Sequence, residues 1–505
     1  MNETASPLRP IPSRGLSLAL LIAAVVFVSY AYFYSGGGWN QNTRFDLVRA
    51  IVERHTLSID AYHENSGDKA YKDGHYYSDN APGQPLLAVP AAALTRRVLT
   101  LMGKDPSSAR GLVLTSYVCN VFSVALPTAL SCACLFLIAI RLGASTAAAS
   151  FGAIAAGLGT PTWAYATLFW GHPLTGACLV FAFTAALMLH ETGASSDIEW
   201  GIALGVAAGW ATVTEYQAVP GSAIVALFAL ARVWQNGWGR RLRVAAAITA
   251  GALPCVAVLM TYLHLAFDSA LHPSYSYVVG PFPWVSKGLF GLTYPRIDVA
   301  FKLLFGFKRG IFTLAPVTLL APFGLRILQK NASTRLAGYA AAAIFVYYLL
   351  LNASYAEWTA GLAFGPRIMG PGMPALCVGL APAFDQIRGR GKYVAMALLA
   401  ISVLFTLMAV ATTPQPEFAS RYPVFDVFMP SFWTGHLALE QSSMLAPSDP
   451  GANDPHGASN LGQLAGLNGL ASLLPLLCVW LLAALSWVKL DAGNAKLALS
   501  ASRRN

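Results

Sequence analysis

The chain has 505 residues, of which 56% are hydrophobic and only 11% are charged. Soluble globular chains carry about 25% charged residues, so this composition excludes an ordinary water-soluble fold and indicates a polytopic membrane protein. The net charge is +10. Because much of the basic excess lies in short loops and the tail, where it sets membrane orientation, we predict no nucleic-acid partner. The cysteines all lie in apolar runs without metal-ligand spacing, so they predict neither a disulfide nor a zinc site.

The first apolar run, residues 16–34, is too long for the apolar region of a signal peptide. We interpret it as a retained helix with a cytoplasmic N-terminus. Further runs, each near the roughly 20 residues that cross about 30 Å of hydrocarbon, centre near residues 125, 157, 180, 208, 226, 255, 318, 344, 377, 402 and 478. The sequence therefore predicts an all-α polytopic membrane bundle of about twelve transmembrane helices, with residues 1–505 forming a single membrane domain.

Alternation of these spans gathers the short basic clusters on one side of the membrane. The clusters comprise Arg240, Arg241 and Arg243; Arg326, Lys330 and Arg335; Arg388, Arg390 and Lys392; and Lys496, Arg503 and Arg504. By the positive-inside rule, both termini are then cytoplasmic, and we expect a bacterial inner membrane. The outer segments are residues 36–110, 267–307, 354–368 and 413–466. We interpret residues 86–102 as an interfacial or re-entrant helix on the outer face, because a span there would reverse the membrane orientation of every later span.

Charged residues concentrate in the first outer segment. Within residues 43–57, apolar side chains recur at helical spacing and predict a short amphipathic helix lying on the membrane. Asp46 and Arg49 share one face of it. A solvated face with local ion pairs is the alternative interpretation of these charges.

Polar residues also lie where later spans meet the outer face. Lys308 and Arg309 stand at an outer entrance, against the positive-inside tendency, and Arg367 follows Gly-Pro where a loop enters the bilayer. A guanidinium there suits a phosphate, because it donates to two oxygens at once; snorkelling to lipid headgroups is the alternative. His172 begins a span and is either functional or structural. Glu215 is a functional candidate because a carboxylate in a membrane is costly, unless it lies at an outer turn.

Four features then follow one another along the chain. An acidic outer loop succeeds the first span, and a turn of the Asp-x-(Ala/Pro)-Pro-Gly type occupies residues 79–83. Arg309 is followed by glycine, and Trp-x-x-Gly-x-x-x-Gly-Pro-Arg runs from Trp358 to Arg367. Together they resemble the GT-C superfamily of integral membrane glycosyltransferases, which includes protein O-mannosyltransferases, the lipid A aminoarabinose transferase and the RgtA/B/C/D-like group.

The resemblance implies sugar transfer at the outer face. The donor is a polyprenyl-phosphate sugar, and the acceptor is a hydroxyl on a lipid, glycan or protein of the cell envelope. An aspartate of the first outer loop takes the acceptor proton while C1 is attacked from the face opposite the phosphate, which inverts its configuration. Cationic side chains stabilise the leaving phosphate, so no metal cofactor is required, although Asp46, Asp60 and Asp79 could converge on one.

The residues of the relatives carry over unevenly. In the aminoarabinose transferase an acidic pair precedes an Arg-aromatic step; here Arg44 begins that step, but Gln41 and Asn42 occupy the acidic places. Asp46, just after the step, is therefore the first candidate for the base, with Asp60 and Asp79 behind it.

The remaining candidates concern the donor and the pocket. Asp79 leads the turn that lies beside the donor phosphate in the relatives, whose lysine is Asn80 here. Pro82 fixes φ and Gly83 permits a sharp turn back to the membrane. The candidates for binding phosphate are Arg44, Lys308, Arg309 and Arg367. The candidates for the substrate pocket are Tyr77, His172, Glu215 and Trp358.

Two other functions remain open. A lipid-linked glycan ligase or polymerase would share the fold but use a pyrophosphate donor. A transporter would use Glu215, His172 and Arg367 as an ion or proton path. Transporters usually carry matching broken helices in repeated halves, and the sequence has no visible repeat.

Overall fold

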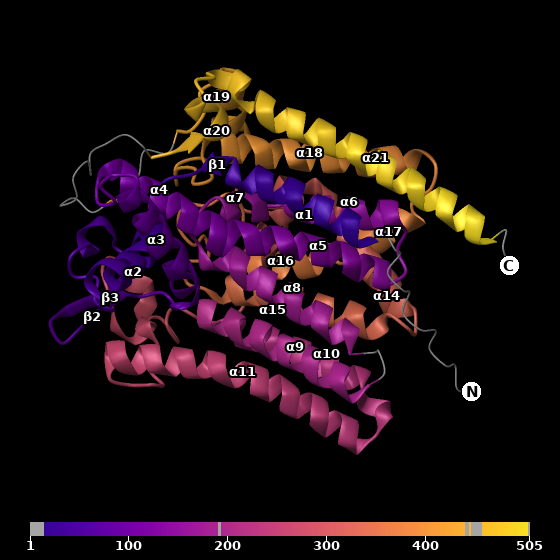
Figure 1. Cartoon of the computed structure of the whole chain (residues 1–505), viewed down its shortest axis with the longest axis horizontal. Coiled ribbons are helices and arrows are strands. Elements are labelled where there is room, and N and C mark those ends of the chain that lie inside the picture. Colours follow the sequence, from indigo (N-terminus) through magenta and orange to yellow (C-terminus); the bar gives the residue numbers. More distant parts are fainter. Residues whose placement is uncertain (1–14, 190–192, 440–443, 446–456, 503–505) are drawn as a thin grey trace.

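The computed structural model describes residues 15–189, 193–439, 444–445 and 457–502. Arg503 and Arg504, which entered the prediction of orientation, lie outside these residues. The helices run alongside one another between the two ends of an elongated bundle (Figure 1). An all-α polytopic architecture is therefore confirmed.

Helices account for most of the described chain. The longer ones are α1 (Gly15–Ala31), α2 (Trp39–Arg54), α3 (Gly83–Leu101), α4 (Ala109–Asn120), α5 (Leu126–Arg141), α6 (Thr146–Leu158), α8 (Gly171–Met188), α9 (Ala194–Thr214), α10 (Ala218–Arg232), α11 (Trp238–Phe267), α14 (Ala321–Lys330), α15 (Arg335–Ser354), α18 (Arg390–Thr412) and α21 (Leu474–Ser502). The shorter ones are α7 (Thr162–Ala166), α12 (Ile297–Phe305), α13 (Ile311–Leu314), α16 (Met373–Cys377), α17 (Leu380–Gln386), α19 (Met429–Trp433) and α20 (Leu461–Leu464).

Five short strands accompany the helices. They are β1 (Phe33–Tyr34), β2 (Lys69–Lys72), β3 (His75–Ser78), β4 (Val278–Val279) and β5 (Ser459–Asn460). β2 pairs with both β3 and β4, and β1 pairs with β5, always antiparallel.

Six helical segments of the described chain are long and apolar enough to cross a membrane. They are Ala109–Arg141, Gly171–Met188, Trp238–Phe267, Arg335–Ser354, Arg390–Thr412 and Gly469–Leu490. The exact count of twelve spans is not confirmed. Several predicted runs are short or broken: the run near residue 318 is divided among α13, a 3₁₀ turn and α14, where Pro316 and Pro322 remove backbone donors.

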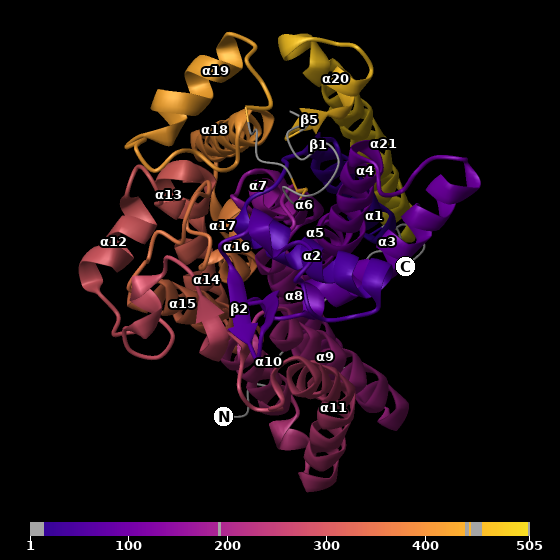
Figure 2. The same cartoon turned by 90° about the vertical axis from the view of Figure 1, so that its left-hand side faces the viewer.

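The two ends of the bundle differ in character. The described parts of the four predicted outer segments gather at one end, on the left of Figure 1 and facing the reader in Figure 2. We call this the loop end. The helix junctions that carry the basic clusters, such as the start of α11 and the α17–α18 turn, lie at the opposite end. The predicted outer segments and the basic clusters therefore lie at opposite ends of the bundle, as the sequence predicted. Which side of the membrane each end faces stays a prediction.

Glycines permit close helix packing beneath the loop end. A Cβ added at Gly205 on α9 would lie 2.1 Å from the carbonyl oxygen of Ile248 on α11. A Cβ at Gly251 on α11 would lie 2.2 Å from the carbonyl oxygen of Ile202. Small residues at such crossings let backbones approach, as in other membrane helix pairs.

The first outer segment differs from the expectation of a helix lying on the membrane. α2 begins at Trp39, and every residue from Asn40 to Ala50 is buried. α3 and β3 both pack against α2, and Phe45 and Val48 of α2 share an apolar cluster with Ala88 and Ala92 of α3. α3 spans the region predicted as an interfacial helix; it buries Ala88 and Ala92 and exposes leucines on its other side, as an amphipathic helix does.

Candidate active site

A cavity of about 790 Å³ opens at the loop end. This volume lies within the roughly 300–1,000 Å³ that is typical of small-molecule sites. Its ionisable lining residues include Asp68, Asp79, His172, Glu215, Glu357 and Arg367. Its aromatic lining residues are Trp39, Tyr275, Phe282, Trp284, Phe290, Tyr355 and Phe418. The cavity therefore combines clustered carboxylates, one guanidinium and a broad aromatic surface.

A tight hairpin brings two of the carboxylates together. Asp73 and Gly74 both have positive φ, 51° and 91°, and form the two-residue turn between β2 and β3. Asp-Gly suits such a turn because both positions require positive φ. The resulting register pairs Lys69 with Ser78, so Asp68 and Asp79 follow one step beyond the last pair. Their side chains both line the cavity.

The environment of these two carboxyls differs. Burial raises the pKa of Asp79 well above its ordinary value, the neighbouring Asp68 adds to the rise, and Arg44 opposes it. Burial also raises the pKa of Asp68, but the charges of Arg367 and Arg44 and the amide of Asn40 oppose that rise. Asp79 is therefore the carboxyl with the greater tendency to hold a proton.

Arg367 faces the cavity from the loop between α15 and α16. Its guanidinium lies over the ring of the fully buried Trp170, 4.7 Å from the ring centroid. Burial lowers the pKa of Arg367, and the carboxylates of Asp68 and Glu215 oppose this effect. Within the described residues no direct ion pair joins Arg367 to Asp68 or Glu215. The guanidinium thus shares an open space with the carboxylates.

Arg309 holds the loop that carries Arg367. It is buried and donates hydrogen bonds to the backbone carbonyls of Gly361, Ala363 and Gly365. Lys308 turns away and donates to the carbonyl of Phe418. Neither side chain lines the cavity, so these two candidates for binding phosphate contact the protein backbone instead.

A buried ion pair lies at the floor of the cavity. Arg44 is fully buried, and its Nη2 donates to Glu215 Oε1 at 2.8 Å. His172 Nδ1 lies 3.4 Å from the same oxygen. The first residue of α8 has to be small here, because a Cβ at Gly171 would lie 2.4 Å from Glu215 Oε1. Glu215 itself follows the last residue of α9, so it occupies the turn between two helices.

Four other candidates lie away from the cavity lining. Asp46 is fully buried, and Asn65 Nδ2 approaches its Oδ1 at 3.4 Å. Asp60 is at the surface, 2.7 Å from His75 Nδ1. Tyr77 packs on Phe267 with 5.2 Å between ring centroids, and the ring of Trp358 lies 5.8 Å from Lys302 Nζ. Asp46, the first candidate for the base, therefore does not reach the cavity in this structure.

The sequence interpretation did not single out Asp68, Gln217, Tyr275, Tyr355 or Glu357. One signal for Asp68 was present in the sequence: an Asp-Gly pair flanked by residues of two short strands predicts a hairpin, and its register would have set Asp68 beside Asp79. The others have no such signal. Gln217 Nε2 lies 3.1 Å from the Tyr355 hydroxyl and 3.4 Å from that of Tyr275, a contact between segments far apart in the chain.

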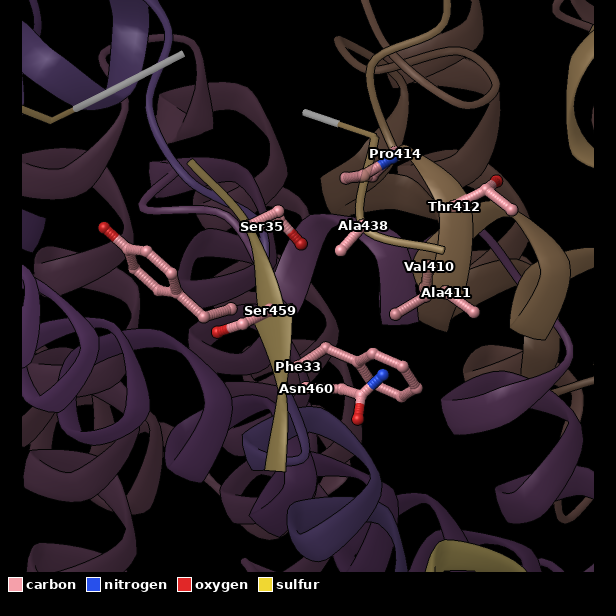
Figure 3. Close-up of a pocket in the computed structure, with 11 residues that line it drawn as sticks. Phe33, Ser35, Val410, Ala411, Thr412, Pro414, Ala438, Ser459 and Asn460 are labelled. Atoms are coloured by element: carbon pink, nitrogen blue, oxygen red, sulfur yellow. The ribbon is translucent and has the colours of Figure 1, made fainter. Parts of the chain in front are cut away.

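A second cavity of about 10 Å³ lies where β1 and β5 pair beneath the end of α18 (Figure 3). Its described lining includes Phe33, Ser35, Thr412 and Asn460 but no carboxylate, histidine, lysine or arginine. It therefore lacks groups for acid–base chemistry. Across the described residues, no three histidine, cysteine, aspartate or glutamate side chains are grouped as metal ligands.

No protein-family model matches the chain, and no curated protein matches it. Solved structures do. ArnT from Cupriavidus metallidurans in the apo state superposes with a TM-score of 0.50 at 18% identity, covering 81% of this chain and 67% of ArnT. The chain has the GT-C fold. The same enzyme bound to undecaprenyl phosphate gives a TM-score of 0.50 at 18% identity, over 84% of this chain and 69% of ArnT.

The GT-C fold confirms what the four ordered motifs predicted about architecture. Each motif is loose by itself, and the identity to ArnT is only 18%. The fold explains why the polar outer segments converge: the GT-C bundle brings them to one end, where the cavity lies.

Proposed function

We propose that this GT-C chain is a glycosyltransferase that moves a sugar from a polyprenyl-phosphate donor to a hydroxyl of a cell-envelope lipid, glycan or protein. The observation that carries the proposal is that Asp68, Asp79 and Arg367 face one cavity at the loop end of an apolar bundle. A lipid donor suits this setting, because its tail lies in the membrane while its phosphate reaches the cavity. The ArnT structure with undecaprenyl phosphate supports the same donor class.

The reaction is a single displacement. Asp79 accepts the proton of the acceptor hydroxyl, the acceptor oxygen attacks C1 of the sugar, and the bond from C1 to the phosphate oxygen breaks. The bonding electrons leave with the phosphate, which Arg367 stabilises. C1 is inverted, and the products are a glycoside and polyprenyl phosphate. Asp79 suits the base because its raised pKa brings its basicity closer to neutral pH, where general bases work best.

The charges around the two carboxyls support this assignment. Arg367 is the leading charge that opposes the rise in the pKa of Asp68, whereas the charges that act on Asp79 are Asp68, Arg44 and Glu215. In an inverting displacement the base and the leaving phosphate lie on opposite sides of C1, so we favour as the base the carboxyl on which Arg367 acts less, Asp79.

The cationic lining favours a monophosphate over a pyrophosphate donor. Of the described residues around the cavity, Arg367 alone carries a permanent positive charge. A pyrophosphate carries more negative charge and is commonly met by several cations or a metal ion. Arg44, Arg309 and Lys308 are committed to contacts within the protein. This argues against the ligase or polymerase alternative.

We further propose that the reaction uses no metal and takes place on the outer face of a bacterial inner membrane. The transporter alternative loses support because Glu215 and His172 both line this one cavity, where Glu215 pairs with Arg44 and lies 3.4 Å from His172 Nδ1. A transport path requires such groups to lead across the bundle.

The test is transfer of a radiolabelled sugar by purified protein, with the same sugar presented on polyprenyl monophosphate and on polyprenyl diphosphate. Envelope extracts supply the acceptor. We expect label to move from the monophosphate and Arg367→Ala to reduce that transfer, with Asp60→Asn as a surface control. Transfer from the diphosphate alone would establish the ligase alternative, and no transfer from either would reject the proposal.

A further inference from the structure

Arg44 was a candidate for binding phosphate, but in the structure its guanidinium forms hydrogen bonds with neighbouring side chains instead. The side chain is fully buried beneath the cavity and is absent from the lining. Its Nη2 donates to Glu215 Oε1 at 2.8 Å and to Asn80 Oδ1 at 2.9 Å. Its Nε donates to Asn40 Oδ1 at 3.2 Å. One cation thus contacts a carboxylate and the oxygen ends of two amides.

These contacts fix the direction of both amides. A guanidinium only donates hydrogen bonds, so each asparagine must present its carbonyl oxygen to Arg44 and turn its NH₂ group away. Asn80 Nδ2 is thereby directed to Asp79 Oδ1, 2.8 Å away. Asn40 Nδ2 donates to Asn80 Oδ1 at 3.0 Å. A reversed Asn80 amide would face Asp79 with its oxygen and repel the carboxylate.

We propose that Arg44 is a positioning residue, held by Glu215, that orients Asn80, together with Asn40 beside it, so that Asn80 donates a hydrogen bond to Asp79. The inference rests on the proposed function only in giving Asp79 a role in catalysis. A hydrogen bond aimed at Asp79 stabilises the charged form that accepts the proton.

Several ionisable neighbours influence the pKa of Asp79. The charged neighbours are Asp68, Glu215 and Arg44, and the tyrosines outside the spans whose pKa responds to Asp79 are Tyr216 and Tyr275. Ser274 Oγ donates to the backbone carbonyl of Asp79 and leaves its carboxylate unaffected. Among these partners, Arg44 is the cation and Asn80 the amide donor, so their removal raises the pKa of Asp79.

The decisive variant is Asn80→Leu. It loses the donor to Asp79 and adds no charge beside it, so a merely structural role for Asn80 would leave the pKa of Asp79 unchanged. A second variant, Asn40→Leu, removes a donor to Asn80 Oδ1 but keeps the donor from Asn80 to Asp79. A third variant, Arg44→Met with Glu215→Gln, frees both amides without leaving an unpaired buried charge. The matched control is Arg49→Met with Glu53→Gln, which removes a 3.1 Å ion pair from the same helix away from the cavity.

The primary measurement is the pH dependence of carbodiimide coupling at Asp79 and Asp68, followed by mass spectrometry, because coupling consumes the protonated carboxyl and needs no activity. We expect Asn80→Leu to raise the midpoint at Asp79 by about 1–2 pH units, as for loss of a hydrogen bond to a charged group. Asn40→Leu should have a smaller effect at Asp79, because Asn80 keeps its donor, and the Arg44 variant should raise the midpoint at Asp79. The Arg49 control should leave both midpoints unchanged.

Kinetics separates this inference from the proposed function. If wild type transfers sugar, the midpoint of the acid limb of its pH–rate profile should rise in Asn80→Leu as the coupling midpoint does. If wild type transfers none, the proposed function fails, but the coupling midpoints still test the orientation. An unchanged midpoint at Asp79 in the Asn80→Leu protein would overturn the inference, whether or not the Arg44 variant folds.

Discussion

Asp79→Asn is the substitution that tests the catalytic assignment most sharply. Asparagine has nearly the same shape as aspartate and retains an oxygen to accept the 2.8 Å hydrogen bond from Asn80 Nδ2. It also relieves the repulsion between Asp79 and Asp68, since these carboxyls follow the same hairpin pair. We therefore expect the variant to fold at least as stably as wild type while losing the proton acceptor.

The size of the loss follows from the role of a general base. A positioned base contributes about 10²–10⁴-fold, which corresponds to roughly 3–5 kcal/mol of transition-state stabilisation. We expect single-turnover transfer in Asp79→Asn to slow by that factor at saturating donor, with donor binding nearly unchanged. Asp60→Asn, whose carboxylate pairs with His75 at the surface, and Asp46→Asn, away from the lining, are the controls. If Asp79→Asn kept half of the wild-type rate while Asp46→Asn lost it, the assignment of the base would be refuted.

Four further outcomes follow from the same geometry. Arg367→Ala should raise the donor KM about 10–100-fold, by loss of hydrogen bonds to a charged phosphate, and Arg367→Lys should recover part of it in the same titration. Because the pKa of Asp79 is raised and the base must be charged, kcat/KM should fall as pH drops through a midpoint above the ordinary carboxylate range; a profile flat down to pH 4 would contradict this. Chelation with EDTA should leave transfer unchanged, and loss of activity restored by Mg²⁺ or Mn²⁺ would show a metal requirement. Gly171→Ala should lower stability by about 1–3 kcal/mol through overpacking, since its Cβ would lie 2.4 Å from Glu215 Oε1, whereas Gly239→Ala, with nothing within 4 Å, should not lower the melting temperature.

The bundle was predictable because its signals are local and repeated. Apolar runs and basic clusters gave the all-α architecture and the alternation of the two ends. Helix count was harder, since Pro316 and Pro322 divide one apolar run into short pieces that no simple length criterion recognises. The burial of α2 was also missed: its amphipathic pattern is equally suited to a membrane surface and to a protein groove, and only the packing of α3 and β3 decides.

The site was predictable only where single residues are unusual. Arg367, His172 and Glu215 attracted notice because charges at membrane boundaries are rare, and all three line the cavity with Asp79. Arg44 and Arg309 drew attention for the same reason, yet their guanidinium groups bind neighbouring segments. The presence of a charged residue does not tell whether its side chain binds a ligand or stabilises the fold. That depends on which residues distant in the sequence lie next to it.

A structure determined with a bound polyprenyl-phosphate sugar tests the central claim most directly. The account predicts that the phosphate lies against the guanidinium of Arg367, that C1 faces the side of the cavity where Asp79 lies, and that Arg44 keeps its contacts with Glu215 and Asn80. Density for the phosphate at Lys308 or at Arg44, or a sugar whose C1 lies beyond the reach of Asp79, would contradict it.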